Sequence, residues 1–186
     1  MGMPPPARLF VIMAAEAPTA VVIRRGPSSW SNIVAWRTTD DVFTEGAWFK
    51  GRIFAEKCDL SPDGELFVYA AHKGKNLRTS YSDAWTAVSR PPWLHALALW
   101  PLGTTYGGGG RFKGNCQLVG RGLHRAHPDH TVGALELVTG SAPYHASTNE
   151  VDGRSGREEI RTTDSSSRRR VACSPEKAGK TYSLRT

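Results

Sequence analysis

The sequence predicts an all-β protein of antiparallel strands, arranged like propeller blades or as a small sandwich and followed by a largely disordered basic tail. Two observations predict the fold class. All six tryptophans lie between Trp30 and Trp100, among short apolar runs separated by turn residues. Helical periodicity is scarce in the same stretch. A third observation sets a boundary, because the chain after the glycine run at 107–110 is rich in Arg, Ser, Thr and Gly.

Composition and charge support this boundary. Residues 111–186 hold 12 Leu, Ile, Val and Phe residues among 76, about 16%, against the roughly 20% below which chains tend to stay disordered. The net charge of the whole chain is +7, and 13 Lys and Arg against 8 Asp and Glu place +5 of it after residue 110. We therefore expect a folded β-rich domain over 7–106 and a glycine linker with a basic, disordered tail over 107–186.

The runs near the N-terminus are expected to be strands, since they are short, end at turn residues and are rich in β-branched or aromatic side chains. They are LFVIMAA (9–15) and TAVVIRR (19–25), which predict a hairpin, and WSNIVAWRT (30–38). The next run, VFTEGAWFKGRIFAEK (42–57), contains Gly46 and Gly51. Glycines inside such a run favour strands with bends over a helix.

The strongest local signal is the turn Ser61-Pro62-Asp63-Gly64, in which Pro fixes φ and Gly accepts positive φ. The apolar run Leu66–Tyr69 that follows is predicted to be a buried strand. The last two runs, WTAVSR (85–90) and WLHALALWP (93–101), are also read as strands, the latter because prolines bracket it. Most of the tryptophans are expected to fill the core.

The string LSPDGELFVY (60–69) resembles the turn and strand of WD-repeat-like β-propeller blades. TAVVI (19–23) and ELFVY (65–69) form a weak repeat offset by 46 residues, near the period of propeller blades. The N-terminal part also resembles a group of uncharacterised bacterial proteins, and this resemblance implies a class but no chemistry. It rests on the segments RRGPSSW, WFKGRI, CDLSPDGELFVY, TAVSRPPWL and ALWP.

The chain departs from that pattern after the glycine run, where RFKGNCQLVGRGLHRAH stands in place of an expected apolar strand. This departure raises the alternative that the C-terminal part is unrelated sequence. A closed propeller needs at least four blades, whereas residues 1–110 hold about two blade lengths. Unpaired N–H and C=O groups at open strand edges would then be available to pair with another chain, so we expect a protein partner or self-association through these edges.

The leading functional hypothesis is a non-catalytic binding or scaffold module. No hydrolase triad or nucleophile elbow is recognisable, so an enzyme is the less favoured class and no cofactor is expected. Trp30 and Trp93 lie beside serines and prolines, and they are the tryptophans expected to be exposed for partner binding.

Two alternatives remain open. The first is non-specific nucleic-acid association, because guanidinium groups neutralise phosphates; its candidate residues are Arg154, Arg157, Arg161, Arg168, Arg169 and Arg170. The second is a metal-dependent enzyme with Cys116, His124, His127 and His130 as ligands. Pro128 interrupts any helix that would align the last two histidines.

Cysteine usage and hydropathy bear on location. Cys58, Cys116 and Cys173 are odd in number and far apart, which indicates no disulfide framework and favours a reducing, cytoplasmic setting. No run approaches the roughly 20 apolar residues of a membrane-spanning helix, so no membrane association is expected.

Overall fold

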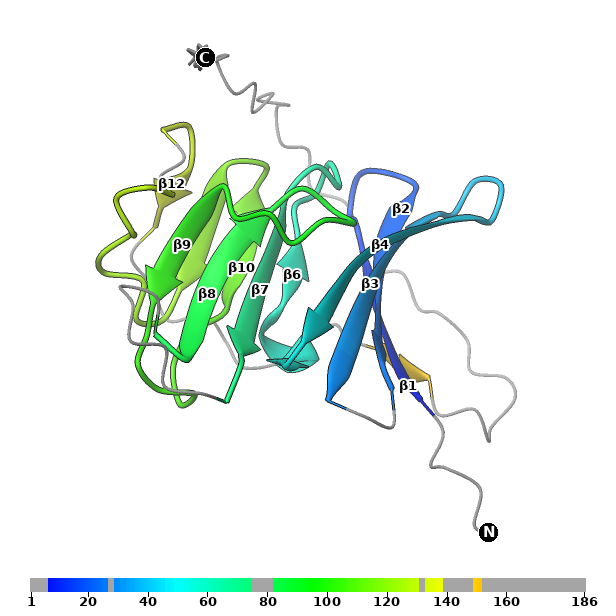
Figure 1. Cartoon of the computed structure of the whole chain (residues 1–186). Coiled ribbons are helices and arrows are strands. Elements are labelled where there is room, and N and C mark those ends of the chain that lie inside the picture. The colour runs from blue at the N-terminus through cyan, green and yellow to red at the C-terminus, as the bar shows by residue number, and fades with distance from the viewer. Residues whose placement is uncertain (1–6, 27–28, 75–81, 131–132, 139–148, 152–186) are drawn as a thin grey trace, which may run out of the picture.

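The computed structural model describes residues 7–26, 29–74, 82–130, 133–138 and 149–151. It confirms the predicted all-β class: the strands form three sheets, and their pairs are antiparallel except for one short parallel pair (Figure 1). The first sheet has the order β13-β1-β2-β3-β4, the central sheet holds β5 to β9, and the third sheet has the order β10-β11-β12. The strands are β1 (Arg8–Met13), β2 (Thr19–Arg25), β3 (Trp30–Arg37), β4 (Val42–Lys50), β5 (Arg52–Ile53), β6 (Asp59–Leu60), β7 (Phe67–His72), β8 (Ala84–Ser89), β9 (Ala98–Pro101), β10 (Gly110–Gly114), β11 (Gln117–Gly120), β12 (Glu136–Leu137) and β13 (Asn149–Val151).

The first sheet is a meander in which each of β1 to β4 pairs with the next along the chain. The predicted hairpin is confirmed, with Arg8 opposite Arg25 and Met13 opposite Ala20. Strand β13 pairs with the other edge of β1. The register of β3 with β4 shifts between Asn32 and Val34, so that Gly46 and Ala47 of β4 lie opposite Ile33, and this bulge confirms the expected bend.

In the central sheet, the predicted Ser-Pro-Asp-Gly turn joins β6 to β7. The amide of Gly64 donates to the carbonyl of Ser61 at 2.8 Å, and the amide of Leu66 donates to the Ser61 hydroxyl at 2.9 Å. Gly64 has a φ of +76°, which explains the glycine at this corner. Strand β7 follows with five buried residues in succession, as its continuous apolar run predicts.

One outer strand of the central sheet is interrupted. Both β5 and β6 pair with β7, and the short 3-10 helix η1 (Ala55–Lys57) lies between them. Strands β7, β8 and β9 then continue as an antiparallel meander. The fold thus contains two successive meanders, and β2 and β7, which carry the weak sequence repeat, are second in each.

Packed structure extends beyond the predicted boundary at residue 106. Strands β10 and β11 form a hairpin, and Leu118, Val119 and Leu123 are buried. The low average apolar content of residues 111–186 concealed this cluster. A core needs only a few apolar side chains close together, and an average over 76 residues does not show where they lie. Residues 152–186, the last 35 residues of the predicted tail, lie outside the described residues.

The glycine run also differs from the expected linker, because its end packs tightly between the central and third sheets. The amide of Gly109 donates to the hydroxyl of Thr86 at 2.7 Å. A Cβ at Gly109 would lie 2.4 Å from the carbonyl oxygen of Lys57, and φ there is +77°. Both the close approach and the backbone conformation therefore require glycine.

Two hydrophobic clusters lie on opposite faces of the central sheet. On one face, Phe67 and Tyr69 of β7 pack with Ile23 and Ile33 of the first sheet. On the other face, Val68, Val88 and Trp100 pack with Leu118 and Leu123 from the third sheet region. The alternation of side chains along β7 explains this division. Figure 1 shows the resulting succession of sheets, with β1 to β4 at one side and β9 and β12 at the other.

Candidate functional site

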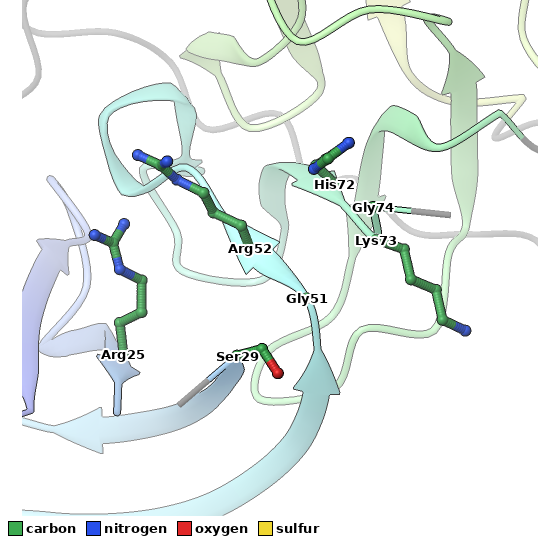
Figure 2. Close-up of a pocket in the computed structure, with 7 residues that line it drawn as sticks. All are labelled: Arg25, Ser29, Gly51, Arg52, His72, Lys73 and Gly74. Atoms are coloured by element: carbon green, nitrogen blue, oxygen red, sulfur yellow. The ribbon is translucent and has the colours of Figure 1, made fainter. Parts of the chain in front are cut away.

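A pocket lies where the first and central sheets meet, at the ends of β2 and β7 and at the β4–β5 junction (Figure 2). Its volume is about 380 Å³. We call it the basic pocket, and the described residues that line it are Arg25, Ser29, Gly51, Arg52, His72, Lys73 and Gly74. It thus combines side chains from both sheets.

Hydrogen bonds to Gly51 hold the β4–β5 junction beside the basic pocket. The amide of Gly51 donates to the carbonyl of Ser29 at 2.7 Å, and the hydroxyl of Ser31 donates to the carbonyl of Gly51 at 3.2 Å. A Cβ at Gly51 would lie 2.4 Å from the ring of Phe49 and 2.7 Å from the carbonyl oxygen of His72. Glycine at this junction therefore allows β4 and β7 to approach closely.

Strand pairing then places the charged side chains. Arg52 and His72 are directly opposite each other in the β5–β7 ladder, so both side chains leave the same face of the sheet. The guanidinium of Arg52 lies 4.8 Å from the centroid of the Phe54 ring. The guanidinium of Arg25 lies 5.8 Å from the centroid of the Phe10 ring. Such cation–π contacts favour particular orientations of the two arginines.

The electrostatic character of the basic pocket is one-sided. Arg25, Arg52 and Lys73 are cationic, and the described lining includes no Asp or Glu. Figure 2 shows Arg25 and Arg52 extending toward the same side, whereas the Lys73 ammonium extends the other way. Like charges that share a pocket repel each other and raise the local concentration of anions. Chemically, the arrangement suits the binding of a negatively charged group.

The four predicted metal ligands are not brought together. His127 and His130 lie near each other, with ring centroids 5.6 Å apart, but His130 Nδ1 is 3.1 Å from the carbonyl oxygen of Ala96. His124 lines a different pocket, beside β11 and β12. Cys116 is disulfide-bonded and offers no free thiolate. Within the described ranges, no group of three or more His, Cys, Asp and Glu side chains is placed to hold a metal ion.

The two tryptophans predicted to be exposed are exposed. Trp30 lies at the start of β3 with 39% of its surface accessible, and Trp93 lies in the β8–β9 connection with 57% accessible. Trp48 is exposed as well, at 54%, although a core position was expected. The partner-binding role of Trp30 and Trp93 stays a prediction. The six tail arginines, Arg154, Arg157, Arg161, Arg168, Arg169 and Arg170, lie outside the described residues.

No protein-family model matches the chain, and no curated protein or solved structure matches it either. The resemblance to propeller blades and to a bacterial group therefore stays a prediction. Across the described part of the chain, no helix has the length and apolar character needed to cross a membrane. The chain is an all-β protein of successive, mainly antiparallel sheets, with a basic pocket between two of them.

Sequence reasoning missed the basic pocket because its residues are far apart along the chain. Arg25 ends one strand, Arg52 begins another, and His72 ends a third, directly before Lys73. The only local signals were basic residues at strand ends, Arg24-Arg25 and His72-Lys73. Basic residues at strand ends are common on protein surfaces, and only the β5–β7 pairing reveals that these converge.

Proposed function

We propose that this protein is a non-catalytic binding module that recognises phosphate-bearing anionic ligands in the basic pocket. The observation that carries the proposal is that Arg25 and Arg52 extend toward the same side of one pocket of about 380 Å³, which Lys73 also lines. Guanidinium groups present paired N–H donors that match phosphate oxygens. The imidazole of His72 and the hydroxyl of Ser29 add further hydrogen-bonding groups.

The volume of the basic pocket favours the binding of a small ligand. Small-molecule sites typically measure about 300–1,000 Å³, and the basic pocket lies at the lower end of that range. A phosphorylated group the size of a nucleotide fits this volume better than a bulky apolar ligand. This proposal keeps the binding-module hypothesis and places the anion contact in the folded part of the chain.

The experiment is calorimetric titration of the full chain with inorganic pyrophosphate as the probe. Replacing Arg52 with Gln or Arg25 with Gln is expected to weaken binding about tenfold each, because a charge-assisted hydrogen bond is lost. Arg90→Gln is the matched control. It removes the same charge at an exposed side chain that bonds Glu65 at 3.0 Å and does not line the pocket. Unchanged binding is expected for this control.

Two results would contradict the proposal. One is an absence of pyrophosphate binding to the wild-type chain. The other is an equal loss in Arg90→Gln and Arg52→Gln, which would indicate a general effect of charge rather than a site.

Nucleic-acid association through the tail is the second candidate, favoured by the +5 charge of residues 111–186. A labelled single-stranded oligonucleotide, titrated at two salt concentrations, tests it, because phosphate contacts give salt-dependent affinity. Binding that is lost on removal of residues 152–186 but kept in Arg52→Gln would assign it to the tail. A protein partner, a cytoplasmic location and a metal-dependent activity stay predictions.

A further inference from the structure

The first sheet has a second face that points away from the central sheet. Ile12, Val21, Ile23 and Ile33 fill the core on the inner side. Because successive side chains of a strand point to opposite faces, the residues between these positions form the other side. We call this side the outer face.

Strand register arranges most of the outer face in three rows that cross β1, β2, β3 and β4. The rows are Met13–Ala20–Trp36–Phe43, Val11–Val22–Val34–Glu45 and Leu9–Arg24–Asn32–Trp48. Every member except Glu45, Arg24 and Asn32 is apolar. The outer face is thus mainly apolar, with Glu45 and Arg24 as the charged members of its rows, while Ala20 and the polar Asn32 are buried among their neighbours.

Several of its side chains are open to solvent. The exposed fractions are 51% for Met13, 58% for Phe43 and 54% for Trp48. Trp36 and Phe43 stack across the strands, with centroids 5.5 Å apart and ring planes 14° apart. Large contiguous apolar patches of this kind on soluble proteins mark interaction sites.

The charges of the outer face are separated along the strands. Glu45 lies toward the β3–β4 hairpin, where Asp41 accepts a hydrogen bond from the indole N–H of Trp36 at 3.0 Å. Arg24 and Lys50, the latter opposite Trp30, lie toward the other end. Along β4, the outer face thus carries an acidic residue nearer the hairpin, Glu45, and a basic residue farther from it, Lys50.

We propose that a second copy of this chain covers the outer face, packed face to face as an isologous dimer. A face with charges of one sign would fit an oppositely charged partner, whereas a face with both signs fits itself. A two-fold axis in the plane of the interface and perpendicular to the strands lays β4 of one copy over β4 of the other in reverse direction, and so brings Glu45 of each copy over Lys50 of the other. An axis parallel to the strands would oppose acid to acid. The central sheet already buries both of its faces by the same sheet-on-sheet packing.

Sedimentation equilibrium of the full chain tests the dimer. The wild-type chain is expected to show twice the single-chain mass of 20.3 kDa. Phe43→Asp is expected to reduce the mass to one chain, because the patch then buries an unpaired charge. Tyr106→Asp changes an aromatic residue that is 93% exposed on a loop and should remain dimeric. A wild-type chain that is monomeric at all concentrations, or a dimeric Phe43→Asp, would overturn the proposal.

A charge exchange tests the orientation of the two copies. Glu45→Lys places like charges together and is expected to weaken the dimer at least fivefold. Adding Lys50→Glu should restore wild-type affinity, since the two ends have then exchanged signs. Thermal melting of each variant confirms folding, and both positions are exposed. A double variant as weak as Glu45→Lys would rule out this antiparallel arrangement.

Discussion

The central sheet is buried on both faces, whereas the first sheet is buried on one. Strand β7 of the central sheet has five buried residues in a row, and Phe67 and Val68 are each fully buried. In β4 of the first sheet, Phe43 and Trp48 are more than half exposed although both are aromatic. Aromatic content therefore does not distinguish a core strand from a surface strand in this chain. The difference lies in what covers each face, and both proposed binding regions belong wholly or partly to the less covered sheet.

Replacing Val68 with Asp is expected to break the central sheet, and this is the largest effect we predict. Val68 is fully buried between β7 and the third sheet. An unpaired carboxylate there should cost several kcal/mol of unfolding free energy, enough to unfold a domain of ordinary stability. Chemical denaturation followed by circular dichroism gives the measurement.

The matched control is Val42→Asp, made in the first sheet at a side chain that is 42% exposed. Its effect should stay within about 1 kcal/mol, since exposed substitutions are usually mild. Equal melting curves for the two variants would show that the central sheet is not the better covered one.

Within both sheets, some features could be predicted from the sequence and others could not. The hairpin of β1 and β2 and the turn at Ser61-Pro62-Asp63-Gly64 depend on neighbouring residues, and both are present as expected. The buried strand after this turn was predictable for the same reason, because a continuous apolar run needs cover on both faces. Local chemistry therefore determined these elements.

Features that depend on distant residues were not predictable. The third sheet was not predicted because Leu118 and Leu123 are buried against Val68, which lies more than forty residues earlier in the chain. Exposure of Trp48 depends on whether another sheet covers β4, which its own sequence does not encode. The basic pocket depends on the pairing of Arg52 with His72. In each case a long-range contact supplies the missing information.

The junction between the central and third sheets is expected to be sensitive to Gly109→Ala, with the second-largest effect. A Cβ there meets the Lys57 carbonyl oxygen at 2.4 Å, and φ is +77°. We expect a loss of roughly 2–3 kcal/mol from overpacking and backbone strain. Denaturant titration of the full chain measures this loss.

Gly103→Ala serves as the control for backbone conformation alone. Gly103 has a φ of +66°, and nothing lies within 4 Å of an added Cβ. Its loss should be about 1 kcal/mol. Similar losses at both positions would mean that the glycine run is a linker after all, as composition suggested.

The smallest predicted effect concerns the thiol of Cys58, which lies between η1 and β6 in the core shared by the first and central sheets. Burial raises the pKa of this thiol from 9.0 to about 12, and its Sγ lies 3.1 Å from the carbonyl oxygen of Phe54. The thiol therefore stays protonated in the native protein at neutral pH. Iodoacetamide should label it slowly in the native chain and rapidly after denaturation, as read by peptide mass mapping.

The same pKa shift gives a stability prediction with a definite sign. Because the folded state holds the proton more tightly, the stabilising contribution is complete below pH 9.0 and is lost as pH rises toward about 12. Between pH 9 and pH 10 this loss amounts to at most about 1.4 kcal/mol. Cys58→Ala removes the titrating group, so its unfolding free energy should fall less over that interval. A variant that loses as much stability as the wild type over the same interval would show that the thiol is not held in a closed interior, and the two sheets would then meet less tightly than the packing of β6 and β7 indicates.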